Sequence, residues 1–379
     1  MEFTCEKSDL QKGVSAVERI VAARSTLPIV SYVLFQADKT GLRLSANNLD
    51  LGVELGLPAK VTKEGAILVP AKTLGGIVSR LPDTKISFKL TEKGTIIISF
   101  GQSNFNVHTL PPDEFPALPK VKDGKTFSLP TNLFASMIKQ TIFSVSSSED
   151  KHVLTGVLLD LGKGMVGDDS SIRLVATDGY RLAKRGEKIK IKDDVKGKVI
   201  IPAKALQELF RLIELDGGED ELNIHFSGDQ ISFRFSDVAL VSRIIQGQFP
   251  DFRQVLPKKS GNKLVMNRRV LLEAAERAGV IASGSANIVR FEIKGGKLHL
   301  FASTPDVGTI DEIVEAEIKA EVKSQIAFNI RLIVDVLKVM ETEKIVLELS
   351  DNLGPGILKE DGGSDYVYVV MPIKTQEGV

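Results

Sequence analysis

One segment of the chain has the glycine spacing of a dinucleotide-binding loop. Residues Gly162-Lys163-Gly164-Met165-Val166-Gly167 fit the pattern G-x-G-x-x-G and follow a strand-like run, Val157 to Leu161. In such loops the phosphates bind at the N-terminus of the helix that comes next. Here Asp168-Asp169-Ser170-Ser171 and another strand-like run follow instead. The sequence therefore predicts a hairpin, in which the Asp168–Asp169 pair is a solvated turn rather than a pair of catalytic carboxylates.

Other patterns of catalytic or metal-binding residues are missing from the sequence. The four histidines, His108, His152, His225 and His299, lack the spacing of metal ligands. Cys5 is the single cysteine, so it forms no internal disulfide, and we expect a small buried side chain. The chain has no Walker loop and no G-x-S-x-G nucleophile motif. We therefore predict no catalytic residue, no metal and no cofactor.

Basic side chains recur at similar positions of three predicted helices. Each helix carries two of them, seven or eight positions apart: Lys72 with Arg80, Lys204 with Arg211, and Arg331 with Lys338. This spacing places both members of a pair on one helix face. Solvated helices often carry such residues, but the recurrence favours a positive surface that attracts a phosphate backbone regardless of base sequence. Arg24, after an earlier predicted helix, is a further candidate, whereas base stacking is a poor one because the chain has no Trp.

The composition is that of a globular protein of two or three domains. The chain has 379 residues, 43% of them hydrophobic, and its 49 basic side chains balance its 49 acidic ones. A neutral chain can bind nucleic acid only through local placement of its cations. No signal peptide and no membrane-spanning apolar run of ~20 residues is present. With its single cysteine, the chain is therefore predicted to be a soluble, cytoplasmic protein.

The elements that must position these side chains repeat three times. Val69-Pro70-Ala71-Lys72 returns as Ile201-Pro202-Ala203-Lys204 and as Phe328-Asn329-Ile330-Arg331. The interval is roughly 130 residues, far longer than a solenoid unit. Such a period indicates a repeated domain. Clusters of Pro and charged residues place the boundaries near residues 122 and 257, which gives domains 1–122, 123–257 and 258–379.

Each repeat is predicted to contain a strand, a helix and three strands, followed by the same order again. In the first repeat the helices are expected at Lys7 to Ala23 and at Ala71 to Leu81, where apolar residues have helical spacing. The strands are expected at 2–6, 33–36, 42–46, 53–57, 66–69, 85–90, 95–100 and 104–110. Strands dominate, with about two helices in each repeat.

Four strings of residues resemble those of the bacterial sliding clamps, the beta subunits of the replicative DNA polymerase. They are Arg24-Ser25-Thr26-Leu27-Pro28-Ile29, Ala176-Thr177-Asp178-Gly179-Tyr180-Arg181-Leu182-Ala183, Phe249-Pro250-Asp251-Phe252 and Tyr368-Val369-Val370-Met371-Pro372-Ile373. The resemblance covers the whole chain. It implies an α+β fold of three clamp-type domains, each with two helices packed against antiparallel sheets. It also implies a closed ring, assembled head-to-tail from two copies, around double-stranded DNA.

The resemblance also assigns roles to particular residues. Phe105 and Val107 are expected to meet Val280 and Ile281 of the second copy. Lys151 and His152 are expected to touch DNA, in a segment where some members carry tyrosines. Replicative DNA polymerase, clamp loader and repair proteins are expected to bind with short apolar peptides. The implied pocket residues are Leu154, Thr177, Gly179, Arg181, Leu182, Pro250, Val255, Val369, Val370, Met371, Pro372 and Ile373.

The sequence departs from the family pattern in four respects. Gln254 stands where many members carry a basic residue, and His152 and Val153 stand where some members carry tyrosines that are thought to touch DNA. The chain is neutral rather than acidic, and residues 375–379 extend past the usual end. Two other functions stay open at this point. One is an enzyme that uses Asp178 and Arg181, and the other is a scaffold that binds peptides but not DNA.

Overall fold

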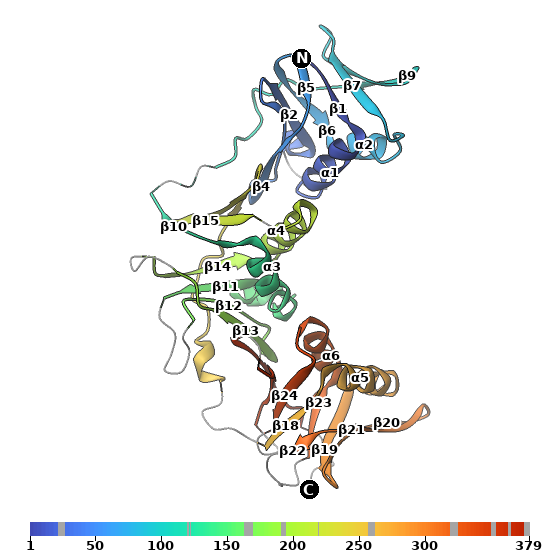
Figure 1. The fold of residues 1–379 in the computed structure, drawn as a ribbon, viewed down its shortest axis with the longest axis vertical. Helices are drawn as coiled ribbons and strands as arrows, with labels where there is room; N and C mark the ends of the chain where they lie inside the picture. Colours follow the sequence, from blue (N-terminus) through green and yellow to red (C-terminus); the bar gives the residue numbers. More distant parts are fainter. Residues whose placement is uncertain are drawn as a thin grey trace. The chain divides into compact units, whose positions relative to one another are not determined.

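The structure is a computed structural model (Figure 1). It describes residues 1–21, 27–119, 121, 123–162, 170–190, 195–218, 220–256, 262–318, 325–349, 354–362 and 365–374. By its internal contacts the chain divides into two compact units. The first consists of Met1–Phe134 and Lys204–Ile244, and the second of Ala135–Ala203 and Ile245–Val379.

The first unit contains the whole first repeat and two parts of the second, residues 123–134 and 204–244. Its helices are α1 (Lys7–Glu18), α2 (Ala71–Val78) and α4 (Ala203–Asp216). Its strands in chain order are β1 (Glu2–Glu6), β2 (Tyr32–Asp38), β3 (Gly41–Asn47), β4 (Leu51–Leu57), β5 (Lys60–Lys63), β6 (Gly65–Pro70), β7 (Lys85–Leu90), β8 (Thr95–Phe100), β9 (Ser103–His108), β10 (Lys125–Pro130), β15 (Glu221–Ser227), β16 (Gln230–Phe235) and β17 (Val238–Arg243).

Two antiparallel sheets build this unit. One has the order β5-β1-β7-β8-β9, and the other has the order β10-β15-β16-β17-β4-β3-β2-β6. In the larger sheet β17 pairs with β4, with Leu240 opposite Val53, so strands of two repeats share one ladder. Phe3, Phe35 and Phe88 are fully buried together, and the rings of Phe3 and Phe88 stack at 4.6 Å. Helices α1 and α2 lie beside each other against this core (Figure 1).

The second unit contains the rest of the second repeat and the whole third. Its helices are α5 (Arg268–Ala282) and α6 (Ile330–Val339), and α3 (Thr131–Lys139) lies mostly within it. Its strands are β11 (Gly156–Leu161), β12 (Ile172–Thr177), β13 (Arg181–Glu187), β14 (Gly197–Pro202), β18 (Asn262–Asn267), β19 (Ile288–Lys294), β20 (Lys297–Thr304), β21 (Gly308–Glu315), β22 (Glu317–Ile318), β23 (Gln325–Asn329), β24 (Lys344–Leu349), β25 (Gly356–Glu360) and β26 (Asp365–Val370).

Strands of two repeats share a ladder here as well. The larger sheet has the order β14-β11-β12-β13-β26-β25-β24-β18-β22, and the smaller has the order β21-β20-β19-β23. Strand β13 pairs with β26, with Leu182 opposite Val369. Helices α5 and α6 pack beside each other (Figure 1). Both begin at an asparagine N-cap: the Asn267 side chain accepts from the amides of Arg269 and Val270, and the Asn329 side chain accepts from the amide of Arg331.

The predicted element order is confirmed in the first repeat apart from one additional strand, and both helices end earlier than predicted, α2 at Val78 rather than at Leu81. Helix α1 ends at Glu18 rather than at Ala23, because the chain turns there into the core. Ile20 is fully buried, its amide donates to Val17, and its carbonyl accepts from Asn48. Strand β5 was not predicted, because its mostly exposed sequence K-V-T-K has no apolar alternation, and pairing with β1 forms it.

The glycine-rich segment lies between antiparallel partners, as the hairpin prediction requires. Leu161 of β11 is opposite Ile172 of β12, and no helix begins at Ile172. Residues 163–169, including both turn aspartates, lie outside the described residues. The strand that follows leaves no helix N-terminus to hold a pyrophosphate.

The remaining predictions about single features concern Cys5, metals and membranes. Cys5 is buried, as predicted, and burial raises the pKa of its thiol to about 12, helped by Asp9 and Glu6. Among the described residues, no group of three or more His, Cys, Asp and Glu side chains is arranged to hold a metal ion. No helix in the described ranges is both long and apolar enough to span a bilayer.

Candidate functional site

A largely apolar pocket of about 270 Å³ lies within the second unit. Three segments of the chain form most of its walls: the turn between β12 and β13, the connection after residue 249, and the end of β26; Leu154, just before β11, completes the lining. The residues that line it are Leu154, Thr177, Gly179, Tyr180, Arg181, Leu182, Pro250, Asp251, Phe252, Gln254, Val255, Val369 and Met371.

The β12–β13 turn is shaped by its own side chains. The Asp178 carboxylate accepts hydrogen bonds from the amides of Tyr180 (2.8 Å) and Arg181 (3.0 Å). The Thr177 hydroxyl accepts from the Gly179 amide at 3.1 Å and donates to the Arg181 carbonyl at 2.6 Å. Such bonds to neighbouring amides are the reason that Asp and Thr favour turns. They fix the pocket rim at Tyr180, whose side chain is 66% exposed.

Gly179 has a backbone conformation with positive φ, which this tight turn requires. Its φ is +96°, a region that disfavours a side chain. We expect Gly179→Ala to destabilise the turn by about 1–2 kcal/mol and to lower the affinity of the pocket for a peptide. Calorimetric titration with a peptide measures the affinity. Gly295→Ala, also at positive φ but in the β19–β20 turn, is the matched control and is expected to leave peptide affinity unchanged.

The other two walls are pinned by backbone and core contacts. Phe252 is buried in an apolar cluster with Leu182 and Val369, and the Asp251 side chain accepts from the Arg253 amide. At the end of β26 the Met371 amide donates to the Tyr180 carbonyl at 2.9 Å. The Met371 side chain is 40% exposed, so a flexible apolar group stands at the opening.

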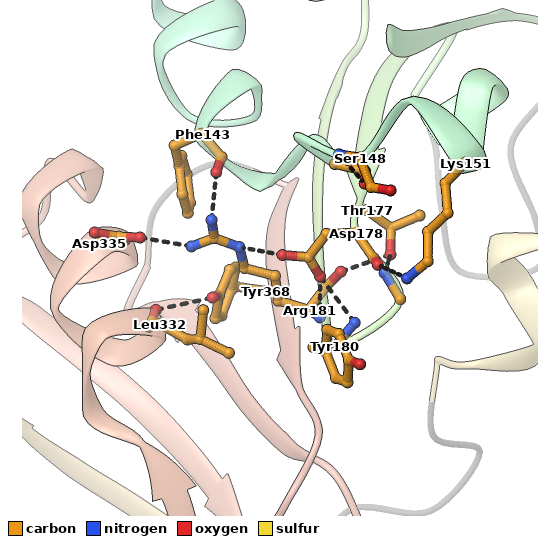
Figure 2. A network of polar contacts seen from close by, with 12 residues as sticks. Phe143, Ser148, Lys151, Thr177, Asp178, Tyr180, Arg181, Leu332, Asp335 and Tyr368 are labelled. Atoms are coloured by element: carbon orange, nitrogen blue, oxygen red, sulfur yellow. Dashed lines mark hydrogen bonds and ion pairs between the residues drawn. The ribbon is translucent and has the colours of Figure 1, made fainter. Parts of the chain in front are cut away.

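Arg181 braces its own turn and connects the pocket to two other segments of the chain (Figure 2). Its Nε donates to Asp178 at 3.0 Å, one Nη donates to Asp335 of α6 at 2.6 Å, and the other donates to the Phe143 carbonyl at 2.6 Å. The guanidinium also lies over the Phe143 ring, 5.3 Å from its centre. Its side chain is only 11% exposed, so these bonds form in a largely desolvated place.

The electrostatics of this network keep Arg181 charged. Burial opposes the charge of the guanidinium, but Tyr368 and the carboxylates of Asp335 and Asp178 outweigh burial and raise the Arg181 pKa. Burial also raises the pKa of the Tyr368 hydroxyl, which donates to the Leu332 carbonyl of α6 at 2.8 Å. Neither group exchanges protons near neutral pH, so the arrangement binds and orients rather than catalyses proton transfer.

The structure brings together most of the predicted pocket residues. Val370, Pro372 and Ile373 do not line the cavity: Val370 points into the core, on the opposite sheet face to Val369 and Met371. The prediction missed Tyr180, Asp251, Phe252 and Gln254 as lining residues. Tyr180, Asp251 and Gln254 are direct neighbours of predicted residues, and Phe252 is two positions from Pro250, so closeness along the chain was the signal that could have found them.

The predicted DNA-contacting residues differ in the contacts that their side chains make within the protein. Lys72, Lys204, Arg331 and His152 are exposed. The others make contacts within the protein: Arg80 with the Gly76 carbonyl, Lys151 with the Asp178 carbonyl, Arg211 with Glu208 and the Ala16 carbonyl, and Lys338 with Glu276. Arg24 lies outside the described residues.

The four residues expected at a subunit interface lie at sheet and helix ends. Phe105 is 40% exposed on the edge strand β9, whereas Val107 is buried. Val280 is 69% exposed on the last turn of α5, and its neighbour Ile281 is half-buried.

Three family models match consecutive parts of the chain. They describe the N-terminal, central and C-terminal domains of the DNA polymerase III beta subunit, and they match residues 1–119, 128–251 and 253–374. The chain is 34% identical to the beta sliding clamp of a Synechocystis strain, over 99% of both sequences.

Solved structures give the same result. The DNA polymerase sliding clamp of Bacillus subtilis superimposes with a TM-score of 0.91 at 28% identity, covering 99% of both chains. A sliding clamp from Pseudomonas aeruginosa bound to griselimycin gives 0.92 at 29% identity, covering 99% of this chain and all of that one.

Proposed function

The chain belongs to the DNA polymerase III beta subunit family and is a processivity clamp of the replicative DNA polymerase, and we propose that it works as a closed ring around duplex DNA. In this proposal two copies join head-to-tail, slide without sequence preference, and tether the polymerase, the clamp loader and repair proteins. The proposed domains are residues 1–122, 123–257 and 258–379. The protein acts in the cytoplasm as a non-catalytic subunit.

The pocket is the observation that carries the tethering role. It is lined mostly by apolar groups, with a fixed cation, Arg181, among the lining residues, which suits a short extended peptide with apolar side chains. Met371 at its opening can repack around different peptides, as a protein with several partners requires. Gln254, in place of a basic side chain, gives that wall a neutral hydrogen-bonding group.

The exposed cations Lys72, Lys204 and Arg331 support the DNA-binding role. A ring holds DNA by topology, so weak contacts with the phosphate backbone are sufficient, and their screening by salt does not release the protein. The internal contacts of Arg211 and Lys338 are also compatible with a scaffold that binds peptides and no DNA. Loading the protein onto circular DNA, as described next, distinguishes a clamp from such a scaffold.

The protein is loaded by a clamp loader onto a nicked circular duplex and washed in high salt, after which the circle is cut. A known clamp, loaded by the same mixture, is the positive control. Retention on the circle and loss after linearisation are the expected results. Equal retention on both forms contradicts a ring, and failure to load while the control loads favours the scaffold.

We expect Val280→Glu to convert the protein from a dimer to a monomer. Val280 is among the most exposed apolar side chains described, and a charge there would be buried without a partner if the interface forms. Sedimentation velocity measures the mass. Val270→Glu, on the first turn of the same helix and 46% exposed, is the matched control and should leave the dimer intact. A dimeric Val280→Glu variant contradicts the proposed interface.

A further inference from the structure

Helix α6 presents a carboxylate among its basic residues. Asp335 follows Arg331 by four positions and precedes Lys338 by three, so all three side chains lie on one face of the helix. All three are partly or largely exposed, with the Asp335 side chain at 44% and the Lys338 side chain at 55%. We call this face, defined by Arg331, Asp335 and Lys338, the basic face of α6.

A carboxylate on this face opposes the role proposed for it. If Arg331 and Lys338 attract DNA phosphates, a partly exposed anion between them repels the same phosphates. Lys338 is already neutralised in part by Glu276 of α5, at 2.9 Å. The basic face would therefore bind phosphate more strongly with a neutral residue at position 335, and some other function must explain Asp335.

Asp335 also forms an ion pair with Arg181, and this contact gives Asp335 a function other than phosphate binding. Its carboxylate accepts from an Nη of Arg181 at 2.6 Å, the shorter of the two ion pairs that Arg181 makes with carboxylates. The remaining partners of Arg181, Asp178 and the Phe143 carbonyl, hold the guanidinium from other directions, as Figure 2 shows. Asp335 is thus the residue of α6 that fixes the side chain of Arg181, which lines the pocket.

We propose that Asp335 is a positioning residue for the peptide pocket. It holds Arg181 in place, and its negative charge weakens the attraction of DNA phosphates to the basic face of α6. This inference rests on the proposed function of the pocket and of the cations. One side chain then affects two binding surfaces in opposite directions. Its removal loosens Arg181 and weakens peptide binding, while it strengthens the binding of duplex DNA.

The test compares Asp335→Ala with Glu276→Ala in the full-length protein. Both changes remove a carboxylate that pairs with a cation in this region, but only Asp335 contacts Arg181. The probes are a fluorescein-labelled peptide from the clamp-contacting segment of the replicative polymerase, and a labelled linear duplex at low salt. Asp335→Ala is expected to weaken peptide binding about 5-fold. Both variants are expected to strengthen duplex binding about 2-fold, an effect that disappears at high salt.

Asp335→Asn separates positioning from misfolding. The amide oxygen can still accept from Arg181, so this variant should retain more peptide affinity than Asp335→Ala while it shows the same gain for the duplex. Unchanged peptide affinity in Asp335→Ala overturns the proposal. Weaker peptide binding without any change in duplex binding by either Asp335→Ala or Glu276→Ala overturns the assignment of the basic face to DNA and supports the positioning role.

Discussion

Replacing Arg181 with alanine is expected to lower the free energy of unfolding of its unit by about 3 kcal/mol, because it leaves charged partners without their counter-ion. Asp178 is only 19% exposed, and the Phe143 carbonyl would lose its donor at the same time. The pocket would lose a lining side chain, and the β12–β13 turn would lose the contact between Arg181 and Asp178. Peptide affinity should fall by roughly 100-fold, the equivalent of about 3 kcal/mol.

Thermal unfolding and fluorescence anisotropy with the labelled polymerase peptide measure the two effects. Arg269→Ala is the control, because Arg269 lies in the same unit and pairs with Glu273 at 2.8 Å, but is 81% exposed. Such an exposed pair contributes at most about 0.5 kcal/mol. If Arg181→Ala binds peptide like the unmodified protein, the pocket that Arg181 supports is not the peptide site.

Reversing the charge of Lys72, Lys204 and Arg331 together is expected to lower affinity for a linear duplex roughly 100-fold at low salt, since each exposed cation–phosphate pair contributes on the order of 1 kcal/mol. The three residues lie near the starts of α2, α4 and α6, one in each repeat. Replacing them with alanine instead should flatten the dependence of log affinity on log salt by about 0.9 for each phosphate that the protein no longer neutralises.

A second triple variant controls for net charge. Lys89, Lys198 and Lys294 are exposed and also lie one in each repeat, but on the strands β7, β14 and β19. Reversing their charges changes the net charge by the same amount, and duplex binding is expected to fall far less. Equal losses in the two variants mean that attraction is diffuse and that the helices form no specific surface. No loss in the helix variant supports the peptide-binding scaffold.

Periodicity in the sequence was sufficient to place most helices and strands of the first repeat. The alternation of β7 and β8 and the helical spacing before Val17 place those elements directly, because one face of each is buried. The end of α1 could not be predicted, since it depends on the Asn48 side chain that donates to the Ile20 carbonyl. Strand β5 could not be predicted because its conformation depends on pairing with β1, which its own sequence does not indicate.

Only the residues of the candidate site that lie in or next to the family-like segments of the sequence could be predicted. Thr177, Gly179 and Arg181 come from one string and meet in the pocket. Val370 belongs to another string, but strand alternation turns it into the core. Asp335 is 154 positions from Arg181, and no pattern in either segment links them. Such a pair exists only through the packing of α6 near β13, so it becomes visible only in three dimensions.

The position of β26 determines when during protein synthesis the pocket can exist. This strand is the last of its sheet to leave the ribosome, yet it lies inside the sheet, between β13 and β25. Until residues 365–371 emerge, β13 has an open edge, Leu182 lacks Val369, and Tyr180 lacks the bond from Met371. In the nascent chain β13 therefore has an unpaired edge, and the complete pocket, with the partner binding proposed for it, requires that these residues have been translated and folded.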